Sequence, residues 1–392
     1  MTSVPTSERV LAPDLARGFA LLLVALAHTA SIFLGNTPGV DQTPEGLERP
    51  YFVVLFVFVH ACALPLFGMM LGYGMVQFAN RQQGLGQPWA STRGVLLRRH
   101  AWLLVFGAVD GVLFFSGDVL GAYGVIGVVF TLLLLRRGPG FYRIPLLYLG
   151  FGFCYLAVLR YLVSTGNTAG GAPVPSSEDP SSLAPTYGDA VRERLTEWPV
   201  TTAVLLSSIL FVWVGAWAAK KRVLEEPEKN RKLLWTGMLG GFGIAIAAAL
   251  PMGLFAGDYL QLDAETAALA KSMYEGAGLF GAIGYLSLFG LIGMALDRKR
   301  AAADRGVVVT AISALGQRTL SAYLFQSVAW LILAPPFMLG LGGQAENPTF
   351  VAAACGLGVW LLSVVVAYLM HRKSYRGPAE ILVRKLAYRP TR

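Results

Sequence analysis

The feature that most limits the fold is a series of apolar stretches, each long enough to cross a lipid bilayer. A membrane-spanning helix needs about 20 mostly apolar residues, and ten stretches meet that requirement. They run approximately over 13–34, 51–79, 96–116, 119–135, 144–163, 199–219, 233–254, 275–296, 308–336 and 349–371. Because a backbone in lipid must satisfy its own hydrogen bonds, these stretches predict an all-α integral membrane protein, a polytopic bundle of about ten transmembrane helices.

The charged residues agree with this class and suggest an orientation. Only 14% of the residues are charged, against about 25% in ordinary soluble domains. The net charge of +9 comes from basic residues between the apolar stretches, with no patch of interleaved aromatic residues, so no nucleic-acid partner is expected. Of the 32 Lys and Arg, 25 fall on one side of the ten stretches and four on the other. The positive-inside rule then predicts a plasma-membrane protein with both termini cytoplasmic.

The chain reads as one domain over residues 1–392, without a soluble domain or a long-period repeat. The short Ser116–Asp118 segment predicts a helical hairpin between the third and fourth spans. An outer loop at 164–198 is polar and rich in Gly and Pro, which predicts a flexible segment that is either functional or disordered. A basic cytoplasmic tail is expected at 372–392.

The three cysteines and the N-terminus carry weaker signals. Cys62, Cys154 and Cys355 lie in apolar segments without metal-ligand spacing, so neither a metal site nor a disulfide is expected. Residues 1–13 lack the basic-then-apolar pattern of a cleaved signal, and the first helix is interpreted as a retained anchor.

The first span carries charged residues at positions that lipid disfavours. A charge in a membrane span costs about 2.5–3.5 kcal/mol on insertion scales, so such residues are functional candidates. Arg17 and His28 are eleven positions apart, which places them on nearly one helix face, about 16 Å apart along the axis. Arg17 is interpreted either as a cytoplasmic anchor paired with Asp14 or as a ligand-binding cation. His28 is interpreted as a general base in the outer half, or as a packing residue that needs a polar partner.

Two aspartates near the predicted hairpin are candidate partners for His28. Asp110 lies inside the third span, and Asp118 lies at the hairpin tip, where it would otherwise serve as a helix N-cap. An Asp behind a His fixes the tautomer of the ring and stabilises the imidazolium. His60 is a rival base, and Arg160 near the end of the fifth span could instead form an ion pair with either aspartate.

A second basic site opens the ninth span. Arg318 follows Gly316-Gln317 on the expected cytoplasmic side, and the basic tail follows the tenth span. Two arginines at cytoplasmic helix starts suit the binding of a phosphate-bearing ligand.

With these residues in view, the chain resembles the YeiB-like membrane proteins, known as domain of unknown function 418, within a superfamily of transmembrane acyltransferases. The likeness covers nearly the whole chain. Its motifs are Asp14-Leu-Ala-Arg17-Gly18, Phe67-Gly-Met-Met-Leu-Gly-Tyr-Gly74, Gly117-Asp118-Val-Leu-Gly-Ala-Tyr123-Gly124, Gly316-Gln-Arg318-Thr-Leu-Ser-Ala-Tyr323-Leu-Phe-Gln326-Ser327 and Arg376-Gly377-Pro378-Ala-Glu380. Family members usually carry Asn at position 28 and His at position 110. The Arg-x10-His spacing formed by Arg17 and His28 is similar to that of the acyltransferase-3 family.

This resemblance implies an acyltransferase with His28 as the catalytic base, assisted by Asp110 or Asp118. It implies an acyl-CoA site, for acetyl-CoA or another acyl-CoA, at Arg17, Asp14, Arg318, Tyr323, Gln326 and Arg376. The acyl acceptor would be an extracytoplasmic small molecule, lipid or glycan, and a homodimer is compatible with this reading. Two alternatives stay open: a transporter or flippase-like carrier that uses the same buried charges, and a scaffold in which they only pair.

Overall fold

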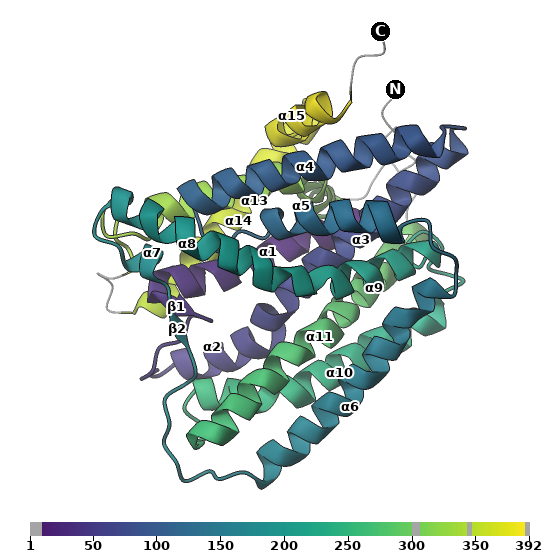
Figure 1. Cartoon of the computed structure of the whole chain (residues 1–392). Coiled ribbons are helices and arrows are strands. Elements are labelled where there is room, and N and C mark those ends of the chain that lie inside the picture. Colours follow the sequence, from purple (N-terminus) through teal and green to yellow (C-terminus); the bar gives the residue numbers. More distant parts are fainter. Residues whose placement is uncertain (1–9, 300–305, 343–346, 389–392) are drawn as a thin grey trace.

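The structure is a computed structural model that describes residues 10–299, 306–342 and 347–388 (Figure 1). Its α-helices are α1 (Leu11–Leu34), α2 (Glu48–Leu55), α3 (Ala61–Gly84), α4 (Trp89–Leu113), α5 (Leu120–Val129), α6 (Ile144–Thr165), α7 (Pro180–Leu183), α8 (Tyr187–Leu205), α9 (Ile209–Lys220), α10 (Arg231–Ala256), α11 (Ala264–Lys299), α12 (Val307–Gly316), α13 (Thr319–Leu333), α14 (Pro348–Arg372) and α15 (Pro378–Ala387). Two π-helical turns, Phe56–His60 and Phe130–Leu134, and two 3₁₀ turns, Phe141–Arg143 and Leu206–Ser208, adjoin them. The strands β1 (Asn36–Thr37) and β2 (Ser177–Glu178) form one antiparallel pair. The expected all-α class is confirmed.

Seven helical runs in the described part of the chain are long and apolar enough to cross a membrane. They are Leu11–Leu34, Glu48–Gly84, Phe141–Thr165, Tyr187–Lys220, Arg231–Ala256, Ala264–Asp297 and Pro348–Arg372. Three apolar helices are shorter, namely Leu120–Leu134, Val307–Gly316 and Thr319–Leu333. Helix α4 itself contains four charged residues and covers most of the third expected stretch. All ten expected stretches are thus mainly helical, while a count of ten crossings and the side of the termini stay predictions.

Two sequence-based expectations about segments need correction. The stretch 308–336 is not one helix, because the chain breaks at Gln317 and Arg318 between α12 and α13. The segment 164–198 is not a loop throughout, since it contains β2, α7 and the first turns of α8. The expected turn at Ser116–Asp118 does join two helices, α4 and α5.

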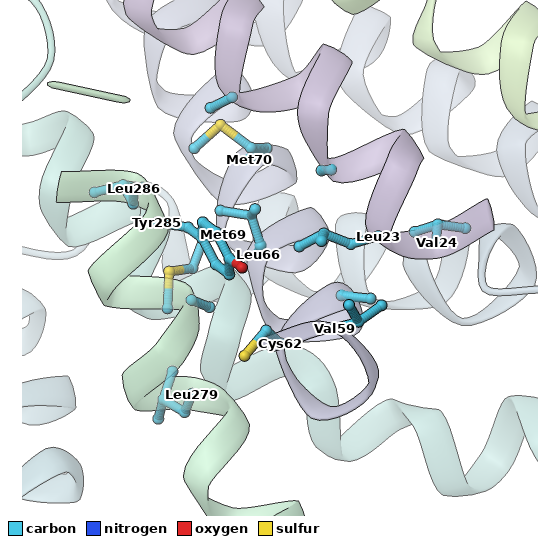
Figure 2. Close-up of a cluster of buried hydrophobic side chains, with 14 of the residues drawn as sticks. Leu23, Val24, Val59, Cys62, Leu66, Met69, Met70, Leu279, Tyr285 and Leu286 are labelled. Atoms are coloured by element: carbon cyan, nitrogen blue, oxygen red, sulfur yellow. The ribbon is translucent and has the colours of Figure 1, made fainter. Parts of the chain in front are cut away.

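Helix α1 lies at the centre of the bundle, in contact with α3, α11, α12, α13 and α14. Helices α6, α10 and α11 run side by side to one side of it, whereas α15 packs against α4 (Figure 1). Between α1, α3 and α11 the core is filled by aliphatic and sulfur-containing side chains, among them Leu23, Leu66, Met69 and Leu279 (Figure 2).

Small residues allow the helices to approach closely. A Cβ on Gly72 of α3 would lie 1.9 Å from the Val212 carbonyl oxygen of α9, and one on Gly215 would lie 2.0 Å from the Met69 carbonyl oxygen. Lipid gives helices no hydrophobic reason to associate, so this packing is a main source of their cohesion. Gly72 and Gly215 therefore allow the close contact between α3 and α9.

Large apolar side chains cover the outside of the bundle. Phe151 and Tyr161 of α6 are 75% and 66% exposed, and Val365 of α14 is 54% exposed. A soluble protein rarely exposes such a continuous apolar surface. The surface fits a multi-pass membrane protein.

Candidate functional site

The helix that carries Arg17 and His28 is unbroken, so the spacing expected from the sequence holds. Both side chains are half-buried and lie on α1. Arg17 Nη1 contacts Asp14 Oδ1 at 3.2 Å, with 21% of the Arg17 side chain exposed. The anchoring ion pair is therefore present, and it leaves part of the guanidinium accessible.

Further basic and polar groups surround Arg17. Arg17 interacts electrostatically with Arg99 of α4 and with Tyr73 of α3. The buried Tyr73 hydroxyl donates a hydrogen bond to Glu225 and accepts one from the Leu224 backbone N–H at 3.1 Å. These contacts tie the α9–α10 connection to the Arg17 end of the bundle, and the sequence had no local signal for them.

His28 lies in an aromatic setting. Its ring centroid is 4.7 Å from that of Phe115 and 6.2 Å from that of Tyr323, the latter in an edge-on arrangement. His60 interacts electrostatically with His28, although the two are far apart in sequence. His60 stacks on Phe56, and its Nε2 is buried without a hydrogen-bond partner among the described residues. The rival base is thus close to the first candidate, in a π-helical turn of the kind often found at functional sites.

The two aspartates lie together in the interior. Asp110 and Asp118 are both fully buried, and their carboxyl groups interact with each other. Asp110 Oδ2 accepts a hydrogen bond from Ser327 Oγ at 2.9 Å, while its Oδ1 has no partner among the described residues. Asp118 accepts backbone N–H groups from Leu120 at 3.0 Å and Gly121 at 2.8 Å, so it does cap α5.

Tyr323 connects the carboxyl pair to His28. Its hydroxyl accepts the Val119 backbone N–H at 3.1 Å and hydrogen-bonds to Asp118, and its ring forms a T-shaped pair with that of His28. In the described structure no hydrogen bond joins His28 directly to either aspartate. The expected His–Asp pair is replaced by a His28–Tyr323–Asp118–Asp110 cluster, and Tyr323 lies here rather than beside Arg17.

The other residues expected in the acyl-CoA site lie elsewhere on α13 and the tail. Arg318 is buried and donates to the carbonyl oxygens of Ala314, at 2.8 Å, and Tyr375. Gln326 Nε2 donates to the Leu21 carbonyl oxygen at 3.2 Å, and Arg376 is exposed. Arg318 therefore holds the tail against the α12–α13 break.

Three buried polar groups near the cluster are not predicted from the sequence, namely Ser327, Arg194 and Trp330. Ser327 is the hydrogen-bond partner of Asp110. Arg194 and Trp330 are 3% and 1% exposed and line a pocket near Phe115. Arg194 falls in the expected outer loop 164–198, and nothing local in the sequence marks its burial. In the described part of the chain no group of His, Cys, Asp and Glu is arranged to hold a metal ion.

Comparison with known proteins gives one matching family and relatives that cover nearly the whole chain. Residues 218–390 match a family described as "Protein of unknown function (DUF418)". The chain is 25% identical to the uncharacterized protein YxaH of Bacillus subtilis (strain 168), over 98% of this chain and 95% of that protein. It is also 25% identical to the uncharacterized protein YeiB of Escherichia coli (strain K12), over 97% of each. The likeness to YeiB-like DUF418 proteins is thereby supported. The printed names of these relatives assign no activity.

Proposed function

We propose that this protein is an integral membrane acyltransferase. It would move an acyl group, with acetyl as the first candidate, from cytoplasmic acyl-CoA to a hydroxyl or amine at the outer side. His28 would remove the proton from the acceptor, and general-base assistance of this kind contributes about 10²–10⁴-fold to a rate.

One observation carries the proposal: a polar cluster that includes His28 lies inside an apolar bundle. His28 belongs to α1, the helix that also carries Arg17. His28, Tyr323, Asp118 and Asp110 are held by α1, α13 and the α4–α5 hairpin. Polar groups inside a membrane protein are expensive and usually functional. The hydroxyl of Tyr323 hydrogen-bonds to Asp118 while its ring contacts that of His28, so this tyrosine holds the candidate base beside the buried carboxyl pair.

The Arg17 end supports the donor side of the proposal. Arg17 is partly accessible and lies near Arg99, and two neighbouring guanidinium groups favour an anionic ligand. The phosphates of acyl-CoA would bind there, and the pantetheine arm is long enough to follow α1 toward His28. Arg318 would act indirectly, by holding the tail in place.

The experiment compares His28→Ala with His60→Ala in purified protein supplied with radiolabelled acetyl-CoA. We expect His28→Ala to bind acetyl-CoA as wild type does but to lose at least about 10²-fold in the hydrolysis or transfer of the acetyl group. His60→Ala is the matched control, since it removes a buried imidazole a short distance away. Full activity of His28→Ala, or loss only in His60→Ala, would contradict the assignment of the base.

A carrier is the second candidate, and the break between α12 and α13 favours it. Discontinuous helices often form the substrate site of transporters, and a pair of buried carboxyl groups can bind and release a proton. Binding of acetyl-CoA to the purified protein separates the two functions. Micromolar binding that weakens in Arg17→Gln supports the enzyme, whereas no binding together with proton-coupled uptake in proteoliposomes supports the carrier.

A further inference from the structure

A small pocket lies at the end of the bundle opposite the Arg17 end, beneath α7. It is lined by Arg194 of α8, Trp330 of α13 and Ser181 of α7, with apolar walls from Ile32, Phe115 and Pro335. The half-exposed Phe115 and Ser182 border it, so the pocket reaches toward the surface. By the charge distribution, this end is expected to face the outside.

Two hydrogen-bond donors among the residues that line this pocket have no partner in the described part of the chain. Arg194 Nε and Trp330 Nε1 are buried without a hydrogen bond to any residue that the structure describes. Arg194 uses Nη1 to donate to the Leu113 carbonyl oxygen at 3.1 Å, which holds the guanidinium in place and leaves Nε available. An unsatisfied buried donor is unfavourable by about the free energy of desolvating it, so two in one pocket indicate that something binds there.

Unpartnered acceptors lie next to the pocket. Glu197 Oε1 accepts the Ser181 backbone N–H at 3.0 Å, but its Oε2 is buried without a partner among the described residues. Asp110 Oδ1 is likewise buried without a hydrogen-bond partner among the described residues. Asp110 lies one turn of α4 before Leu113, whose carbonyl oxygen accepts the hydrogen bond from Arg194. Both carboxyl groups interact electrostatically with Arg194. A ligand that both accepts and donates hydrogen bonds would satisfy both kinds of atom.

The charge and the size of the pocket limit which ligands can bind there. The guanidinium of Arg194 is already balanced by neighbouring carboxyl groups, so an added carboxylate or phosphate would place more negative charge beside Glu197. The cavity is about 10 Å³, close to the space of a single water molecule. A hydroxyl group is of that size, is neutral, and has one donor and two acceptor positions.

We propose that Arg194, Trp330 and Glu197 form a subsite that binds one hydroxyl group of a neutral polyhydroxyl ligand from the outer side. The assignment of this subsite to the acyl acceptor of an acyltransferase rests on the proposed function. The binding of the hydroxyl group does not depend on that function. Phe115 contributes to the wall of this pocket and also contacts His28. The subsite therefore adjoins the candidate base, where a second hydroxyl of the same ligand would be presented.

Saturation-transfer NMR on purified full-length protein, with D-glucose as the probe and no acyl donor, tests the binding. We expect transfer to glucose in wild type, a loss of at least fivefold in Trp330→Phe and Arg194→Lys, and no transfer to acetate. Trp330→Phe keeps an aromatic ring at this position and removes the indole N–H together with the pyrrole part of the ring, so it stays informative if Arg194→Lys fails to fold. Trp235→Phe and Arg192→Lys are matched controls, because both of these side chains are exposed.

Each other outcome overturns the subsite. No transfer to glucose in wild type would mean that the pocket holds only water. Transfer that is unchanged in Trp330→Phe would place glucose elsewhere. Transfer to acetate but not to glucose would make the site an anion site. Because no acyl-CoA is present, a failed acyltransferase assay would leave this result unaffected.

Discussion

Asp118 combines a structural role with membership of the polar cluster, and the two can be separated by substitution. Asp118→Ala removes both hydrogen bonds to the start of α5, a loss typically of about 1 kcal/mol, up to about 2. The substitution also removes a negative neighbour of Asp110, which offsets part of that loss. We expect the free energy of unfolding in detergent to fall by about 1 kcal/mol for Asp118→Ala, and by less for Asp118→Asn, whose amide oxygen still accepts one N–H. Equal loss in both variants would show that the charge, not the cap, matters.

Asp179 gives a pH-dependent contact between the two segments that bear β1 and β2. Its carboxyl group accepts hydrogen bonds from Thr37 Oγ1 at 3.0 and 2.9 Å. Burial raises the pKa of Asp179 to about 6, and nearby Glu197 adds to the increase, while the Thr37 hydrogen bond opposes it. The folded state therefore holds a proton that the unfolded chain has released between about pH 4 and pH 6.

The raised pKa of Asp179 makes the folded state less stable as the pH rises. The contribution of Asp179 to stability is fully present below about pH 4 and is lost as the pH rises through about 6. We expect the melting temperature of wild type to fall relative to that of Asp179→Asn as the pH rises through this interval, because the amide cannot ionise. Thermal unfolding in detergent at pH 4, 5, 6 and 7 measures the difference. A difference that is constant with pH, or one that shifts in favour of wild type, would contradict the raised pKa.

Among the elements, α13 owes its N-terminus to a residue from the distant tail. Glu380 of α15 accepts the backbone N–H groups of Leu320 and Ser321, at 2.9 and 3.1 Å, and the Ser321 hydroxyl. A carboxylate at a helix N-terminus satisfies free N–H groups and complements the helix dipole. This contact holds α15 against the break between α12 and α13.

Glu380→Ala should therefore loosen the tail rather than unfold the bundle. We expect a loss of about 1–2 kcal/mol and faster limited proteolysis near residues 373–378, since α15 loses its attachment to α13. Glu193→Ala, at an exposed position of α8, is the matched control and should change neither quantity. Protection of the tail equal to that of wild type would show that Arg98 and Arg318 hold α15 without Glu380.

These elements also show what could be predicted from the sequence. Apolar length located the helices, and the short polar turn located the α4–α5 hairpin, because both signals are local. The break at Gln317 coincides with the polar residues Gln317 and Arg318, but the apolar stretch continues on both sides of them, so the sequence does not distinguish a break from polar residues within one helix. The break is stabilised by a cap 60 residues away and by Gly316, where a Cβ would lie 1.8 Å from the Asp14 carbonyl oxygen. The candidate site also has a part that the sequence predicts and a part that it does not. The Arg17–His28 spacing is set within one helix, whereas the proximity of Ser327 to Asp110 and of His28 to His60 depends on how distant helices pack.

At the scale of the whole molecule, the proposed chemistry needs the Arg17 end to face the cytoplasm. Single cysteines introduced at Ser176 and Lys229, both exposed, report on the two ends once Cys62, Cys154 and Cys355 have been replaced. In intact cells, a membrane-impermeant maleimide should label Ser176→Cys and should reach Lys229→Cys only after lysis, because the basic α9–α10 connection is expected inside. The reverse pattern would place Arg17 outside, where acyl-CoA is absent, and would contradict the acyltransferase even if the polar cluster is functional. Labelling of both positions in intact cells would put them on one side and contradict the predicted order of crossings.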